Sequence, residues 1–114
     1  MKVYGIPNCN SVKKALDWLN EHKLAYEFHN YKKSGITKNT LSDWCKKVYW
    51  QKLVNKQGTT WRNLDPEVQK AITNKTAAIQ LMMEQTSVIK RPVIEFGDQL
   101  LVGFDEAAFE AAFL

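Results

Sequence analysis

The stretch Tyr4–Lys23, YGIPNCNSVKKALDWLNEHK, contains the transition that decides the fold. Lys2–Ile6 has the composition of a short strand, and Pro7–Asn8 interrupts it. From Ser11 to His22 the apolar residues follow the spacing of a helix that lies on a core: Val12, Ala15, Leu16 and Leu19. Leu24–Tyr31 alternates in part and predicts a second strand. Strand, helix and strand in this order predict a right-handed βαβ unit with parallel strands.

The middle third of the sequence is predicted to be helical and to contain no strand. Thr37 is a candidate N-cap for a helix whose apolar stripe comprises Leu41, Trp44, Cys45 and Val48. Asp65–Pro66–Glu67 has the residues of a helix start, and the apolar face that follows is expected to comprise Val68, Ala71 and Ile72. A further helix is predicted over Thr76–Gln85.

The C-terminal part predicts a hairpin followed by a helix. Val93–Phe96 and Gln99–Val102 are candidate antiparallel strands joined at Gly97–Asp98, and Asp105 is the candidate N-cap of the last helix. The order β-α-β, helical block, β-β-α predicts an α/β fold, a mixed sheet with an inserted helical subdomain. We expect a single domain over residues 1–114, with residues 1–33 and 88–114 forming the sheet part and residues 34–87 the insert.

Composition and charge exclude several classes of protein. The chain has 114 residues, 45% of them hydrophobic, and a net charge of +4 spread over lysine doublets. This charge lacks the clustered patch of a nucleic-acid-binding protein, so no direct DNA contact is expected. No apolar leader follows Met1–Lys2 and no run has membrane-spanning length. We therefore expect a cytoplasmic protein without a membrane contact, most simply a monomer.

Cys9 lies where the first strand has ended and the first helix begins. The unpaired amides of a helix N-terminus and the helix dipole favour a thiolate, which is the nucleophilic form of cysteine. Lys13, one turn further, adds positive charge. The alternative is a small buried apolar residue at the end of a strand. Ser11 either donates a hydrogen bond to the thiolate or satisfies the helix start.

The second cysteine, Cys45, lies within an apolar stripe and is interpreted as a core thiol. A C-x-x-C pair is missing because position 12 is Val12. Cys9 would then act alone, and an outside thiol such as glutathione would have to resolve its mixed disulfide.

Arg91–Pro92 immediately precedes an apolar strand. A cis peptide bond at Pro92 would allow a sharp entry into that strand. Arg91 either presents its guanidinium to an anionic substrate or to the thiolate, or is a solvent-exposed residue at a strand start.

These residues together resemble the arsenate reductase (ArsC) family, whose relatives include the Spx/MgsR transcriptional regulators. The resemblance rests on Cys9 after the first strand, on the helical insert, and on Lys90–Arg91–Pro92 before the hairpin. The segments Gly58–Leu64, GTTWRNL, and Ile89–Pro92, IKRP, are most similar to the YffB-like branch. The resemblance implies a thioredoxin-like (glutaredoxin-like) fold with a helical subdomain and a cis proline at position 92.

The resemblance also implies a function. In arsenate reductases of this type a cysteine attacks arsenate and three arginines hold the oxyanion. Cys9 and Arg91 match two of these residues, but Asn55 stands where the second arginine is expected, and Val102–Phe104 contains no third. The YffB-like branch implies instead an oxidoreductase with glutathione as co-substrate and no bound cofactor or metal.

The catalytic residues implied are Cys9 and Arg91, and the partner is glutathione or a small oxidised thiol. The candidate substrate-binding residues are Asn10, Ser11, Lys13, Arg62 and Pro92. Two alternatives remain open: a Spx-like regulator that binds RNA polymerase, and a true arsenate reductase.

Overall fold

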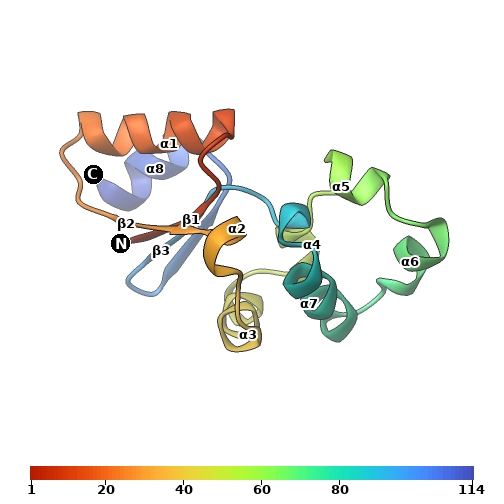
Figure 1. Cartoon of the computed structure of the whole chain (residues 1–114). Helices are drawn as coiled ribbons and strands as arrows, with labels where there is room; N and C mark the ends of the chain where they lie inside the picture. The colour runs from red at the N-terminus through yellow and green to blue at the C-terminus, as the bar shows by residue number, and fades with distance from the viewer. The chain divides into compact units, whose positions relative to one another are not determined.

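The computed structural model describes all 114 residues and divides them into two units. The first unit consists of residues 1–34 and 91–114, and the second of residues 35–90 (Figure 1). The first contains the sheet and the second is built from helices. No helix is long and apolar enough to cross a membrane.

A four-stranded mixed sheet forms the centre of the first unit. Its strands are β1 (Lys2–Gly5), β2 (Glu27–Asn30), β3 (Val93–Phe96) and β4 (Gln99–Val102), in the spatial order β2-β1-β3-β4. β1 runs parallel to β2 with Lys2 opposite Glu27, whereas β3 is antiparallel to both β1 and β4. Gly97 turns the hairpin with a φ of +57°, a conformation that glycine adopts without strain. The predicted parallel βαβ unit and the predicted hairpin are both confirmed.

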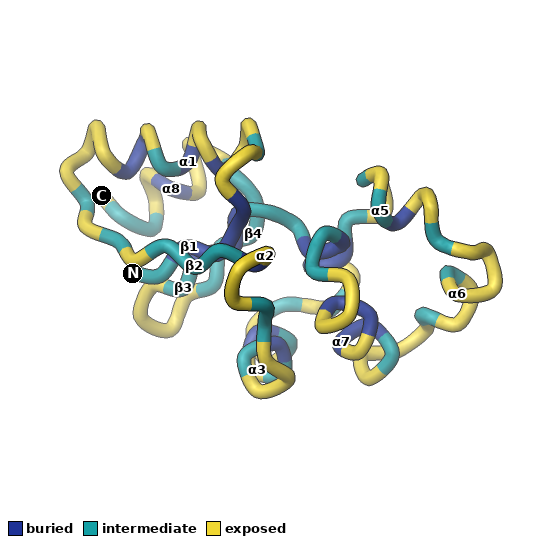
Figure 2. Tube along the Cα trace, viewed as in Figure 1, coloured by how far each residue is buried: buried dark blue, intermediate teal, exposed yellow.

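Helices α1 (Asn10–Glu21) and α8 (Glu106–Phe113) lie on the same face of this sheet (Figure 1). The core beneath them consists of buried residues of β1, β3, α1 and α8: Val3, Ala15, Trp18, Leu19, Ile94 and Phe109. The rings of Trp18 and Phe109 meet edge to face, with centroids 5.3 Å apart. The dark blue segments of α1 in Figure 2 mark these buried positions between exposed turns. The apolar spacing read from the sequence therefore identified the inward face of α1.

The predicted N-caps are confirmed by their hydrogen bonds. Asp105 accepts from the backbone N–H of Ala107 at 3.0 Å, which starts α8. In the second unit, Thr37 accepts from the N–H of Thr40, and Asp65 accepts from the N–H of Glu67. Each bond satisfies an amide that has no partner within its own helix.

The second unit contains several helices that differ in length. They are α3 (Lys38–Lys47), α4 (Trp50–Leu53), α5 (Thr59–Arg62), α6 (Pro66–Ala71), α7 (Lys75–Glu84) and the 3₁₀ turn η1 (Thr86–Val88). Leu41 and Trp44 of α3 are buried, as expected from their spacing, and Ala78 and Met82 of α7 are buried as well. An isolated antiparallel bridge between Val54 and Ile89 joins the residue after α4 to the residue after η1.

The prediction for α6 was wrong in one respect. Val68 is 41% exposed, Ala71 is exposed, and no residue within α6 is buried. This six-residue helix is defined by its Asp65 cap and by Pro66 at its first position. Periodicity marked which side of the helix could be buried, but no element covers that side.

Candidate active site

Cys9 is the N-cap residue of α1. Its backbone is extended, with φ −132° and ψ 125°, and its carbonyl oxygen accepts the first helical hydrogen bond from the N–H of Lys13 at 2.9 Å. The buried residue Ile6 and the exposed residues Pro7 and Asn8 separate it from β1. Cys9 is half-buried.

Close packing between β1 and α1 fixes the start of the helix. A Cβ atom added at Gly5 would lie 2.7 Å from Cγ2 of Val12, well inside contact distance. Val12 is fully buried, and its β-branched side chain has little freedom to move aside. Glycine at position 5 therefore allows the first turn of α1, with its free amides, to lie directly against the end of β1.

The environment of Cys9 lowers the pKa of its thiol below the ordinary cysteine value. Partial burial is the largest single influence and acts to raise the pKa, but four favourable interactions outweigh it. The N–H of Val12, a hydrogen bond from Arg91, the N–H of Ser11 and the charge of Arg91 all favour the thiolate. The Cys9 side chain forms no N-cap hydrogen bond, so the amides of Ser11 and Val12 stabilise the thiolate through electrostatic attraction. The result is a sulfur with more nucleophilic character at neutral pH than a free cysteine has.

The Arg91–Pro92 segment brings the second candidate residue to Cys9. The peptide bond between them is cis, as expected, and Pro92 is buried at the entry to β3. The carbonyl of Pro92 accepts a hydrogen bond from the N–H of Gly103 at 2.7 Å, which ties this entry to the end of β4. Arg91 is half-buried and interacts with the Cys9 sulfur both by hydrogen bonding and by charge.

The other candidate site residues are distributed over both units. Asn10, Ser11 and Lys13 are exposed in the first turn of α1, where Ser11 contributes its backbone amide to the thiolate. Pro92 adjoins Arg91. Arg62 is an exposed residue at the end of α5 in the second unit. Roles in substrate binding for these five residues stay predictions.

Cys45 differs from Cys9 in its electrostatic environment. It is half-buried on α3, where burial raises the pKa of its thiol and the nearby charge of Lys75 only partly offsets this. A raised pKa leaves less thiolate at neutral pH. This agrees with the interpretation of Cys45 as a packing residue.

Sequence reasoning missed a polar and aromatic cluster in the first unit. The hydroxyl of Tyr4 donates to Oε1 of Glu95 at 2.8 Å, and the Tyr4 ring lies 4.8 Å from that of His29 and 6.2 Å from that of Tyr31. Tyr31 is buried, with its hydroxyl unpaired, and the charge of Arg91 acts on it. The period-two spacing of Lys2 and Tyr4 against Val3 places Tyr4 on the face away from Val3, and this signal could have identified the cluster.

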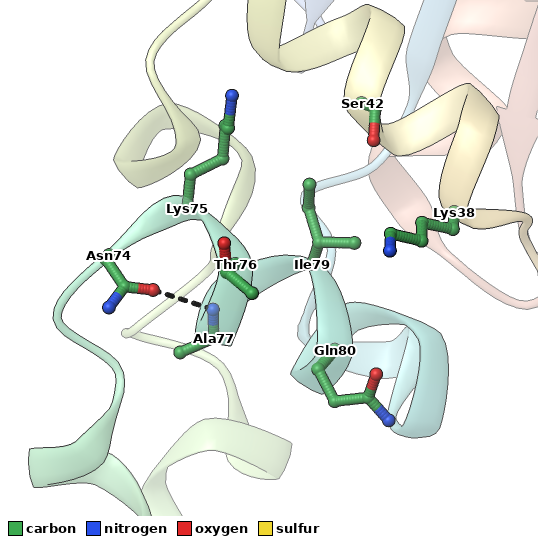
Figure 3. A pocket seen from close by; sticks show the side chains of 8 residues that line it. All are labelled: Lys38, Ser42, Asn74, Lys75, Thr76, Ala77, Ile79 and Gln80. Carbon is green, nitrogen blue, oxygen red and sulfur yellow. Dashed lines mark hydrogen bonds between the residues drawn. The ribbon is translucent and has the colours of Figure 1, made fainter.

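A cavity in the second unit contains neither a thiol nor a carboxylate. It has a volume of about 550 Å³ and is lined by residues of α3, of α7 and of the turn before α7 (Figure 3). Lys38, Lys75, Ser42 and Thr76 surround the side chain of Ile79, and the Asn74 amide oxygen is already bonded to the N–H of Ala77. This cavity therefore offers positive charge and hydroxyls, but neither a thiol nor a carboxylate. Nowhere in the structure do three or more His, Cys, Asp or Glu side chains gather in a way that could hold a metal ion.

Replacement of Arg91 is expected to reduce the reactivity of Cys9. In Arg91→Gln the pKa of Cys9 should move back toward the ordinary cysteine value, because the guanidinium supplies both a hydrogen bond and a charge to the thiolate. The rate of alkylation by iodoacetamide at pH 7 should fall about 3- to 30-fold, since it follows the thiolate fraction. The measurement is the rate across a pH series in a Cys45→Ser background. Lys14→Gln, which removes an exposed charge from α1, is the control and should leave the profile unchanged. An unchanged profile in Arg91→Gln would show that the arginine does not act on the sulfur.

Comparison with known proteins covers nearly the whole chain. A family model described as the ArsC family matches residues 4–112. A relative from Haemophilus influenzae is 43% identical over 111 residues, which are 97% of this chain and 96% of that protein. The solved structure of a protein named YffB is 48% identical with a TM-score of 0.95, covering 99% of this chain and 98% of that one. The global transcriptional regulator Spx of Streptococcus agalactiae is 26% identical over 107 residues, 92% of this chain and 77% of the regulator.

Proposed function

This chain belongs to the ArsC family, and we propose that it is a thiol-dependent reductase that uses Cys9 as its single nucleophile and glutathione as its co-substrate. The observation that carries the proposal is the lowered pKa of Cys9, produced by Val12, Arg91 and Ser11 acting together on one half-exposed sulfur. A cysteine that only filled space in the core would not require neighbours that stabilise its thiolate.

The proposed reaction has two steps of thiol–disulfide exchange. In the first, the Cys9 thiolate attacks the glutathionyl sulfur of a mixed disulfide R–S–SG. The disulfide between Cys9 and the glutathionyl sulfur forms, the S–S bond between that sulfur and the substrate sulfur breaks, and the leaving RS⁻ takes a proton from water. In the second, the thiolate of free glutathione attacks the glutathionyl sulfur on Cys9, which releases oxidised glutathione and restores the Cys9 thiolate. Across both steps, the sulfur of the free glutathione is oxidised to the disulfide level and the substrate sulfur is reduced to a thiol, while the glutathionyl sulfur stays in a disulfide throughout.

Arg91 supports both steps because it contacts the sulfur that is an anion at the start and at the end of the cycle. A low pKa also makes Cys9 a good leaving group in the second step. Since position 12 is valine, no thiol stands one turn away to compete with glutathione for the adduct.

The proposal predicts a covalent intermediate. Oxidised glutathione at neutral pH should add one glutathionyl group to the protein, and peptide mapping by mass spectrometry should locate it on Cys9. Reduced glutathione should remove it, and Cys9→Ser should gain none. An adduct confined to Cys45, or no adduct at all, would overturn the proposal.

A second candidate function is favoured by the similarity to Spx. A regulator of this type would bind RNA polymerase, and its binding would not need a reactive Cys9. Capture of RNA polymerase by both the native chain and Cys9→Ser, together with no adduct from oxidised glutathione, would favour this function over the reductase.

Arsenate reduction has less support. Asn55 stands in the second unit where the family resemblance expects an arginine, and residues 102–104 supply none. The loss of two guanidinium groups removes most of the bidentate recognition of an oxyanion. We expect arsenate turnover with glutathione and glutaredoxin to be weak or absent.

A further inference from the structure

The cavity between α3 and α7 has the dimensions of a ligand site. Its volume of about 550 Å³ lies within the usual range for sites that hold small molecules, about 300–1,000 Å³. All residues of its lining lie between positions 38 and 80, within the second unit. The site is therefore complete within that unit, and Cys9 is no part of it.

One wall of this cavity is apolar. Figure 3 shows the side chain of Ile79 between α7 and the residues Lys38 and Ser42 of α3. Ala77, in the first turn of α7, adds a methyl group to the lining. The aliphatic stems of Lys38 and Lys75 extend this apolar surface while their ammonium groups stay in water. A ligand with an apolar body would remove this surface from water, which favours its binding.

The opening of the cavity is positively charged. Lys38 is the first residue of α3 and Lys75 the first residue of α7, so each wall contributes one ammonium group. The charge of Lys75 also acts on the thiol of Cys45, which places Lys75 on the side of α7 that faces α3. The hydroxyls of Ser42 and Thr76 add two O–H donors to the lining. Cations and hydroxyls on facing walls can bind one oxyanion together.

The acidic residues of these two helices have other partners. α3 contains only Asp43 and α7 only Glu84, and neither lines the cavity. Asp43 forms an ion pair with Lys46 at 3.7 Å, and Glu84 accepts a hydrogen bond from the side chain of Gln80 at 2.7 Å. The two lysines of the lining therefore have no carboxylate among them, and Coulomb attraction favours an anionic ligand.

We propose that this cavity binds a small organic anion that combines an apolar body with one oxyanion group, a carboxylate, sulfonate or phosphate. The apolar body lies against Ala77 and Ile79, and the oxyanion is held between the ammonium groups of Lys38 and Lys75. The same lysines repel a cation, and an inorganic anion leaves the apolar wall in contact with water. The inference does not rest on the proposed function, because no residue of the first unit takes part.

The probe is 1-naphthalenesulfonate, which combines an apolar ring system with one anionic group. It is titrated into the native chain while backbone amide shifts are followed by NMR, and the amides of residues 38–42 and 74–80 should move. Lys38→Gln and Lys75→Gln should each weaken binding about 3- to 10-fold, as expected for loss of a charge-assisted hydrogen bond. Lys47→Gln removes an exposed charge from the end of α3 outside the cavity, and it should leave the affinity unchanged.

The uncharged analogue 1-naphthalenesulfonamide supplies the decisive comparison. It has the same ring system, and it should bind to the native chain at least about 3-fold more weakly than the sulfonate. Lys38→Gln and Lys75→Gln should not weaken its binding further, because loss of the charge on the ligand and loss of the lysine remove the same interaction. Inorganic sulfate, which lacks the ring system, should also bind more weakly than the sulfonate.

Ala77→Leu tests the apolar wall with every charge kept. Ala77 is half-buried in the lining, and leucine is a good helix former, so the larger side chain should occupy part of the cavity while α7 is preserved. The affinity for both naphthalene probes should fall about tenfold or more. Equal affinity for sulfonate and sulfonamide, shifts confined to other residues, no binding of the sulfonate, or unchanged binding in Ala77→Leu would overturn the inference.

Discussion

Cys9→Ser is expected to abolish thiol-reductase turnover, with kcat/KM lowered at least about a thousandfold. The hydroxyl of serine ionises far above neutral pH and forms no disulfide, so neither step of the exchange can proceed. The substitution changes one atom at a half-exposed N-cap position, where serine is also a preferred residue, and the fold should therefore be kept or slightly stabilised. The assay is the reduction of bis(2-hydroxyethyl) disulfide by glutathione, coupled to the oxidation of NADPH by glutathione reductase.

Cys45→Ser is the matched control for this experiment. The same change of sulfur to oxygen is made at the other cysteine, where burial raises the pKa of the thiol and the residue belongs to the packed helix α3. Turnover should stay within about twofold of the native chain, because exposed or half-exposed substitutions have small effects. Equal loss in both variants would contradict a single-cysteine mechanism and would instead indicate that Cys45 resolves the adduct.

The local features of this fold could be predicted because their causes lie within a few residues. Pro7 and Asn8 end β1, so the next residue had to stand at the start of a helix, and Cys9 does. The caps at Thr37, Asp65 and Asp105 follow from side chains that accept hydrogen bonds two or three residues on. In each case the sequence contains both partners of the interaction side by side.

The contacts of the site depend on strand order, which local patterns do not contain. Arg91 reaches Cys9 because β3 pairs with β1, and Tyr4 reaches Glu95 for the same reason. Either strand could have paired elsewhere with the same alternation of apolar residues. The two possible roles of Arg91, a partner of the thiolate or an exposed residue, could therefore be separated only once the register of β1 and β3 was known.

The electrostatics of Cys9 also depend on a packing interaction that does not touch the sulfur. Val12 contributes its amide to the thiolate while its side chain is fully buried against Gly5. The packing of the core on which α1 lies therefore holds that amide in place. Substitutions in this core should act on reactivity through the orientation of α1, even where they are far from the thiol.

Phe109→Ala is expected to have the largest effect on stability, a loss of about 3–5 kcal/mol in the free energy of unfolding of the first unit. Phe109 is fully buried, and its ring packs edge to face against Trp18, Phe104 and Phe113 with centroids 5.0–5.3 Å apart. Truncation removes these contacts and leaves a cavity between α1, α8 and the sheet. The measurement is native-state hydrogen exchange of the β1 and β3 amides, which reports on this unit alone.

Two further substitutions make this result interpretable. Phe109→Leu keeps most of the volume and should cost less than about 1.5 kcal/mol, so it stays measurable if the alanine variant unfolds. Phe96→Ala removes an equal ring from a position that is 37% exposed, and it should cost clearly less than Phe109→Ala because less apolar surface leaves water there on folding. Equal losses at positions 96 and 109 would mean that the core beneath α1 and α8 does not hold the first unit together. Interactions outside this core would then have to hold the Val12 amide in its position next to Cys9.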